Sequence, residues 1–153
     1  MPDIPNTNAN GLSLLSQGNG SNASYWGTPP TTSLTSVQVP VSYMVPGLIK
    51  VAVGATNYLP PFYFPVEYGQ TATLVQVIGS IRTTFPATVN LDIQQNGSTV
   101  AGLSGITLYN GGVPYTPTGT ISVANDDYFQ PVVTSIASLP DGLSLTFYFQ
   151  VSP

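Results

Sequence analysis

The acidic residues are the first candidates for chemistry in this chain. Asp126 and Asp127 form its only adjacent acidic pair, and Asn125 precedes them. Carboxylate and amide oxygens suit Ca²⁺, but calcium loops usually bring about three or more acidic ligands. Asn and Asp also bond to their own backbone in turns. We therefore favour a turn at residues 125–127 over a calcium site, and we expect no metal site and no cofactor.

A pair of carboxylates could also hydrolyse a glycosidic bond. Asp92 lies on the polar side of a predicted strand, and Asp126 or Asp127 could complete a glycosidase pair with it. No feature of the sequence indicates a raised carboxyl pKa or a defined cleft. Serine and threonine nucleophiles need a base, yet the chain has no histidine and a single lysine, Lys50. We therefore expect that the protein is not an enzyme.

Charge is scarce throughout the chain. Two basic and six acidic side chains stand among 153 residues, and the net charge is −4, whereas a soluble domain is typically about a quarter charged. Nucleic-acid binding requires several Lys or Arg, and no basic amphipathic segment suits a membrane surface, so we expect neither partner. Lys50 and Arg82 either pair with acidic residues or carbonyls or stay solvated. The composition favours a protein that fits against other proteins.

The chain divides into two predicted regions, which position the charged residues. The first is an extended N-terminal arm, residues 1–40. This segment is rich in Asn, Ser, Thr, Gly and Pro, and such a composition buries too little apolar surface to order itself. We predict that four of its large apolar residues anchor it on another subunit, because aromatic anchors carry much of the energy at many interfaces. They are Leu14, Leu15, Tyr25 and Trp26. The alternative is that Trp26 folds back on its own domain.

The second region, residues 41–153, is predicted to be all-β. The clearest strand is 143–151, where apolar and polar residues alternate. About seven or eight such segments, separated by turn signals, predict an antiparallel β-sandwich. The long loops favour a jelly-roll-like arrangement. Residues 58–68, rich in aromatics and proline, are expected to be irregular or to lie at an edge.

Three local signals refine this prediction. Asn96-Gly97 predicts a hairpin with a type I′ turn. Asp141-Gly142 predicts a turn before the last strand. Pro131 predicts that the strand at 128–136 lies at an edge or at a bulge, because proline cannot donate to the ladder.

Four segments of the second half follow one another in a set order. An alternating strand at 87–93 leads to the Asn-Gly hairpin at 94–99; an Asp-containing turn follows at 125–128, and an Asp-Gly turn opens the closing strand at 141–145. In this order, residues 70–153 resemble a β-sandwich module of tailed-bacteriophage structural proteins. Residues 14–21 and 25–30 resemble segments of phage fibre and appendage proteins. The shared elements are an apolar pair, a Gly/Asn/Ser turn, and an aromatic with Trp followed by a small residue and Pro.

The resemblance implies a virion structural protein, and such modules occur both as capsid decoration proteins and as fibre or receptor-binding heads. We expect a decoration (cement) protein, assembled in the host cytoplasm as a homotrimer on the outer capsid surface. Its partner would be the major capsid protein, and its arms would tie neighbouring subunits together. The alternative is a tail fibre or baseplate receptor-binding protein that grips host glycans through Tyr63, Tyr109 and Tyr115.

Overall fold

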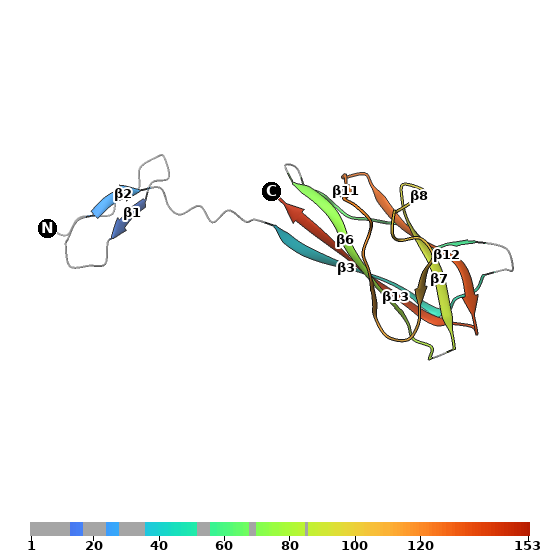
Figure 1. Cartoon of the computed structure of the whole chain (residues 1–153). Coiled ribbons are helices and arrows are strands. Elements are labelled where there is room, and N and C mark those ends of the chain that lie inside the picture. The colour runs from blue at the N-terminus through green and yellow to red at the C-terminus, as the bar shows by residue number, and fades with distance from the viewer. Residues whose placement is uncertain (1–12, 17–23, 28–35, 52–55, 68–69, 85) are drawn as a thin grey trace. The chain divides into compact units, whose positions relative to one another are not determined.

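The computed structural model describes residues 13–16, 24–27, 36–51, 56–67, 70–84 and 86–153 (Figure 1). The chain separates into two compact units, Met1–Ser33 and Leu34–Pro153. The first unit contains two four-residue strands, β1 (Ser13–Ser16) and β2 (Ser24–Gly27), which pair antiparallel. None of the described residues forms a helix long and apolar enough to cross a membrane.

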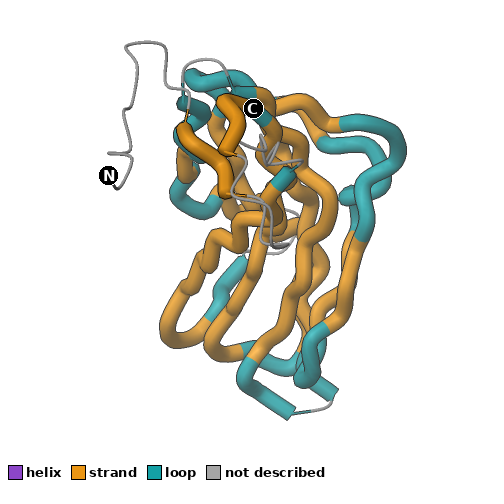
Figure 2. Tube along the Cα trace, turned by 90° about the vertical axis from the view of Figure 1, so that its left-hand side faces the viewer, coloured by secondary structure: helices purple, strands orange, loops and turns teal. Residues whose placement is uncertain are grey.

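The second unit contains two antiparallel sheets, whose strands are joined by loops (Figure 2). The first sheet contains β3 (Val37–Leu48), β6 (Thr71–Ile81), β10 (Val113–Tyr115), β11 (Ile121–Val123) and β13 (Asp141–Ser152). The second contains β4 (Asn57–Tyr58), β5 (Phe62–Tyr63), β7 (Thr88–Gln95), β8 (Ser98–Thr99), β9 (Ile106–Leu108) and β12 (Tyr128–Ala137). The predicted division at residues 1–40 and 41–153 remains a prediction, and β3 begins at Val37.

Each sheet has four strand positions, because short strands share a position beside a longer one. The first sheet runs β3, β13, β6, and then β10 with β11. The second runs β4 with β5, then β12, β7, and β8 with β9. Along the chain these positions follow the order first, second, first, second, second, first, second, first. This is the strand order of a jelly roll, so the predicted all-β, jelly-roll-like antiparallel β-sandwich is confirmed.

The core lies between the two sheets and is filled by alternate residues of the long strands. In β13 the first four apolar residues of the predicted alternation, which include Phe147 and Phe149, are buried, and the last, Val151, is half-buried, as are Thr146 and Tyr148 on the other face. Aromatic rings meet at the centre: the rings of Phe64 and Phe149 stack with centroids 4.2 Å apart. No polar or charged residue of the described ranges is buried. Apolar burial therefore holds the two sheets together, and backbone pairing holds the strands within each sheet.

Pro131 lies in β12, an inner strand, so the predicted edge position is wrong. The predicted alternative, a bulge, is found in this strand, where the register with β7 shifts between Val133 and Ser135. β12 pairs with β7 on one side and with both β4 and β5 on the other. β5 ends its pairing at Phe129 and β4 begins at Val132, so Pro131 falls at the break between them. There the Leu59 N–H donates to the Pro131 carbonyl oxygen at 3.0 Å. The break in the neighbouring strand accommodates a residue that has no N–H to offer.

The Asn96-Gly97 hairpin has the backbone that the sequence predicts. Gln95 pairs with Ser98 across the turn, and the φ angles of Asn96 and Gly97 are 52° and 80°. Positive φ at both central residues is the mark of a type I′ turn. The two-residue loop thus fixes the register of β7 with β8.

The turn predicted at Asp141-Gly142 lies elsewhere. Asp141 begins β13, and the register with β3 shifts between Asp141 and Leu143, where Gly142 has a φ of 67°. The pair therefore forms a bulge inside the strand. The chain instead turns at Ser138 and Leu139, whose φ angles are 53° and 48° although neither is glycine.

Candidate interaction surfaces

The structure brings the four predicted anchors together in one hairpin. Leu14 is the Cα partner of Trp26, and Leu15 is the Cα partner of Tyr25. A two-stranded hairpin is at best marginally stable in water and needs a further strand or a packing surface. The β1–β2 hairpin therefore has the composition of a docking element, and the anchoring role of these four residues stays a prediction.

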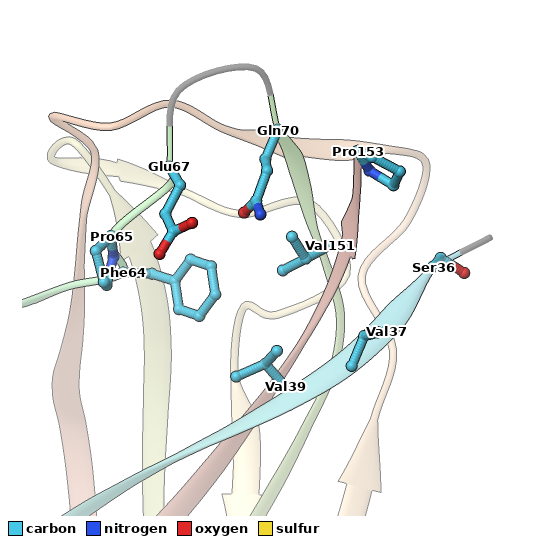
Figure 3. A pocket seen from close by; sticks show the side chains of 9 residues that line it. All are labelled: Ser36, Val37, Val39, Phe64, Pro65, Glu67, Gln70, Val151 and Pro153. Atoms are coloured by element: carbon cyan, nitrogen blue, oxygen red, sulfur yellow. The ribbon is translucent and has the colours of Figure 1, made fainter. Parts of the chain in front are cut away.

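A groove of about 400 Å³ opens at one end of the sandwich. It lies between the start of β3, the end of β13 and the segment after β5, and we call it the end groove. Its apolar lining residues are Val37, Val39, Phe64, Pro65, Val151 and Pro153, and its polar ones are Ser36, Glu67 and Gln70. Figure 3 shows the Phe64 ring lying over Val39, with Val151 on the opposite side.

The end groove combines an apolar floor with polar groups at its rim. Its floor is continuous with the core, because Phe64 stacks on Phe149. Val37 is 52% exposed at the start of β3. Glu67 and Gln70 are exposed and extend over the groove (Figure 3), and the Gln70 N–H donates to the Glu67 carbonyl oxygen at 3.0 Å. Such a site suits an apolar side chain that carries an N–H or O–H donor.

β3 has a free edge in the described part of the chain, since it is the outermost strand of its sheet. Its register with β13 is unbroken from Val37 to Val45, and the strand contains Pro40 and Pro46. Proline fits an edge strand when its missing N–H lies on the solvent side. Two positions of this edge therefore offer no N–H donor to an incoming strand.

The Asp126-Asp127 pair belongs to a turn, as the sequence favours. One oxygen of Asp127, Oδ2, accepts from the Ala124 N–H and from the Gln95 side-chain amide, both at 2.7 Å, and the Asn96 amide donates to Oδ1. These bonds, the one from Ala124 foremost, hold the pKa of Asp127 below its usual value. Within the described ranges no group of three or more His, Cys, Asp or Glu could hold a metal ion.

Three further charged side chains, those of Asp92, Asp141 and Arg82, have local partners. Asp92 accepts from the Gly105 N–H at 2.6 Å and from the Ser104 hydroxyl at 3.1 Å. Asp141 forms an ion pair with Arg82, and this contact raises the pKa of Arg82. The Arg82 side chain is largely exposed, so the pair contributes little to stability.

For Arg82 the structure thus selects pairing from the two alternatives. Lys50 is exposed, and its carbonyl oxygen accepts from the Asn57 side chain at 3.1 Å. Asp92 and Asp127 are each bound to donors of their own neighbouring turn, which is a structural use of both carboxylates.

Two of the three tyrosines of the glycan alternative lie in different sheets, and the third lies in a connection. Tyr63 in β5 is 63% exposed, and its ring centroid lies 6.1 Å from that of Tyr128. Tyr115 in β10 is half-buried, and its hydroxyl donates to the Thr107 carbonyl oxygen. Tyr109 is exposed in the connection after β9. Tyr63 and Tyr115 therefore do not share one surface of a single sheet.

The end groove was not among the sites predicted from the sequence. Its residues come from three separate segments, 36–39, 64–70 and 151–153, which only the jelly-roll connection brings together. One signal was available: Glu67 is a rare charge directly after an aromatic and proline cluster. An isolated carboxylate in that setting indicates an exposed rim beside apolar surface.

Comparison with known proteins leaves the family open. No family model matches the chain, and no curated protein matches it. Among solved structures, one chain of the "Cyanophage Pam1 capsid asymmetric unit" is 16% identical with a TM-score of 0.46, and the alignment covers 98% of this chain and all of that one. A chain from the infectious bursal disease virus Gx strain is 10% identical with a TM-score of 0.31, over 97% of this chain and 45% of that one. Because both TM-scores are below 0.5, neither likeness establishes a shared fold or function.

Proposed function

We propose that this protein is a virion structural protein that decorates the outer capsid surface and attaches through its β1–β2 hairpin. The observation that carries the proposal is the pairing of Leu14 with Trp26 and of Leu15 with Tyr25. Four large apolar residues selected by type alone fall opposite one another in a hairpin that needs a packing partner. The partners we propose are the major capsid protein and further copies of this chain in a homotrimer.

The sandwich supports this proposal in two ways. Jelly rolls of two Greek keys recur in viral capsid proteins and in lectins, so the fold suits a capsid component without selecting one. The carboxylates Asp92, Asp127 and Asp141 all serve local structure. The scarcity of charge suits a permanent contact, because the cores of obligate interfaces are depleted in charged residues. The proposed mechanism is mechanical: hairpins add interface area and tie neighbours together against internal pressure.

Binding to virus particles depleted of the protein tests the proposal. The full chain should bind, and a chain of residues 34–153 should remain folded but bind poorly. In the full chain, Trp26→Ala should weaken binding by about 2–4 kcal/mol if the ring fills a pocket. Equal binding by the full and the shortened chain would refute attachment through the hairpin.

The salt dependence of retention provides a second test. Residues 13–27 contain no charged side chain, so attachment through them should hardly change across a sodium chloride series, since screening acts on exposed charges. Strongly kosmotropic salt should strengthen it. Steep release at moderate salt would instead indicate an acidic patch on a basic capsid surface.

The second candidate is a tail fibre or baseplate protein that binds host glycans. It is favoured by two tyrosines at one edge of the second sheet, Tyr58 and Tyr63, which are 60% and 63% exposed. Exposed aromatic rings in a neutral polar setting suit sugar faces as well as protein surfaces. Imaging of labelled virions separates the candidates, because decoration gives many copies over the shell and a fibre gives few at the tail.

A further inference from the structure

We propose that the end groove receives the β1–β2 hairpin of a second copy of this chain, so that copies join head to tail. The inference shares with the proposed function only the hairpin as docking element. It adds the receiving surface and the identity of the partner. Three properties of the groove and the hairpin support it: the chemistry of the groove, the charge of the occupant, and the length of the connecting chain.

The first step is the chemistry of the groove. Val39 and Val151 are half-buried and Val37 is more than half exposed, so the floor over Phe64 still has apolar area to cover. The Glu67 carboxylate at the rim accepts hydrogen bonds and has no donor to offer when ionised. A tryptophan is a large apolar ring with a single N–H donor, and this donor needs a partner when the ring is buried. Trp26 is the only tryptophan of the chain.

The hairpin and the end groove are also matched in charge. The hairpin segment, residues 13–27, carries no charged side chain, and the end groove has a single charged lining residue, Glu67. A cationic partner would be attracted to Glu67 alone, and it would have to cover the apolar floor with a solvated group. A neutral segment with two leucines, a tyrosine and a tryptophan matches both the floor and the rim. This complementarity favours the chain's own hairpin over a charged peptide.

The segment between the hairpin and the sandwich is long enough to join two copies. Ser36 lines the groove, and residues 28–35 join β2 to it. Eight residues span at most about 26–29 Å when fully extended, which is enough for a hairpin to reach a neighbouring sandwich. Each copy carries one hairpin and one groove, so the contact is heterologous, and such contacts close into rings when the rotation permits. Three copies closed in this way would form the homotrimer that the sequence predicts.

Sedimentation velocity of the full chain across a concentration series tests the proposal. The unmodified chain should form a trimer, and Val37→Asp should raise the dissociation constant at least about tenfold, as expected for a charge placed in an apolar contact. Met44→Asp is the matched control, because Met44 is also an exposed apolar residue of β3 but does not line the end groove. It should leave assembly unchanged. Circular dichroism should show the same folded spectrum for all three proteins.

A mixing experiment identifies the two sides of the contact. Val37→Asp disables the groove and keeps the hairpin, and Trp26→Ala weakens the hairpin and keeps the groove. Each variant alone should be monomeric, whereas an equimolar mixture should form a heterodimer through the one intact pair of surfaces. Glu67→Lys provides a second groove variant outside the strands, in case Val37→Asp fails to fold, and it should complement Trp26→Ala in the same way.

Several outcomes would overturn the inference. A monomeric full chain would mean that the hairpin has another occupant or packs within its own copy. Equal assembly of Val37→Asp and the unmodified chain would remove the groove from the contact, and so would a failure of the mixture to associate. These results are separable from particle binding: a trimer that does not bind capsids refutes the proposed function alone, and a monomer that binds capsids refutes this inference alone.

Discussion

The sandwich and the β1–β2 hairpin are both antiparallel, but their strands receive very different support. In the sandwich, strands such as β6, β12 and β13 have partners on both sides, and their alternate side chains are buried between two sheets. Among the described residues, the hairpin consists of two four-residue strands paired with each other. The difference is one of support, because the strands of the sandwich are buried between two sheets whereas a two-stranded hairpin needs a further packing surface. Under the proposed function, folding and attachment would belong to separate parts of one chain.

The largest expected effect contrasts a core ring with a hairpin ring. Phe147→Ala should lower the free energy of unfolding by about 3–5 kcal/mol, because the ring is fully buried between the sheets and its removal leaves a cavity. Trp26→Ala should leave the urea midpoint unchanged at a protein concentration at which both proteins are monomeric, because association stabilises the folded state. Urea unfolding followed by circular dichroism measures both. A comparable loss in the two variants would break the comparison, since Trp26 would then belong to the core.

The next effect concerns a clamp between strands of the sandwich. Asp127→Asn should lower the free energy of unfolding by about 1 kcal/mol at neutral pH, because three donors converge on an ionised carboxylate. The folded-state pKa of Asp127 is lowered. Its contribution is therefore complete above about pH 4, the ordinary Asp value, and it disappears as pH falls through the folded-state pKa.

Urea unfolding at neutral pH and at about pH 2 checks this prediction, and the gap between Asp127→Asn and the unmodified chain should close in acid. Asp126→Asn is the matched control, because the neighbouring Asp126 side chain is exposed. A gap that persists at low pH would show that the loss comes from packing rather than from the carboxylate charge.

A smaller loss should follow substitution in the β7–β8 turn. Gly97→Val should lower the free energy of unfolding by about 1 kcal/mol, because a β-branched residue at a φ of 80° is strained. A Cβ there would meet only the Tyr128 hydroxyl at 3.5 Å, which is an ordinary contact, so the backbone dominates the cost. Ser98→Val is the control for adding a β-branched side chain beside the turn. A neutral result for Gly97→Val would indicate a shifted register of β7 with β8.

The smallest effect has the opposite sign. Leu139 is exposed and has a φ of 48°, a conformation that costs an L-residue about 1–2 kcal/mol. Glycine relieves this strain but adds about 0.5–1 kcal/mol of chain entropy. Leu139→Gly should therefore stabilise the sandwich by about 0.5 kcal/mol, measured as a higher urea midpoint. A lower midpoint would mean that the Leu139 side chain makes a stabilising contact.

The parts of the fold that could be predicted are those where local pattern and burial coincide. The alternation at 143–151 is visible in the sequence because one face of β13 fills the core. Asn96-Gly97 was predictable because few residue pairs accept positive φ at two positions. The Ser138-Leu139 turn was not, since neither residue favours the backbone that the connection between the two sheets imposes. The edge position predicted for Pro131 was wrong for a related reason. The break between β4 and β5, beside β12, accommodates the missing N–H donor of this proline.

Of the two candidate interaction surfaces, the hairpin and the end groove, only the hairpin residues could be proposed from the sequence. Residue type alone singled out Leu14, Leu15, Tyr25 and Trp26 as candidate anchors, a role that stays a prediction, but it did not predict the strand register that pairs them. The end groove had no comparable signal, because it joins the beginning of β3, the end of β13 and the segment after β5. Contacts between segments so far apart in sequence follow from topology, which a single chain's local pattern does not contain.

The two prolines of β3 affect the tendency of copies of this chain to aggregate through an open sheet edge. A protein with so little charge has weak electrostatic repulsion to keep its copies apart at high concentration. An open sheet edge is then a hazard, because unpaired backbone groups can template strand-on-strand growth into fibrils. Pro40 and Pro46 interrupt the donors along that edge. The two prolines therefore disfavour strand addition at an edge that has no charged side chain in β3.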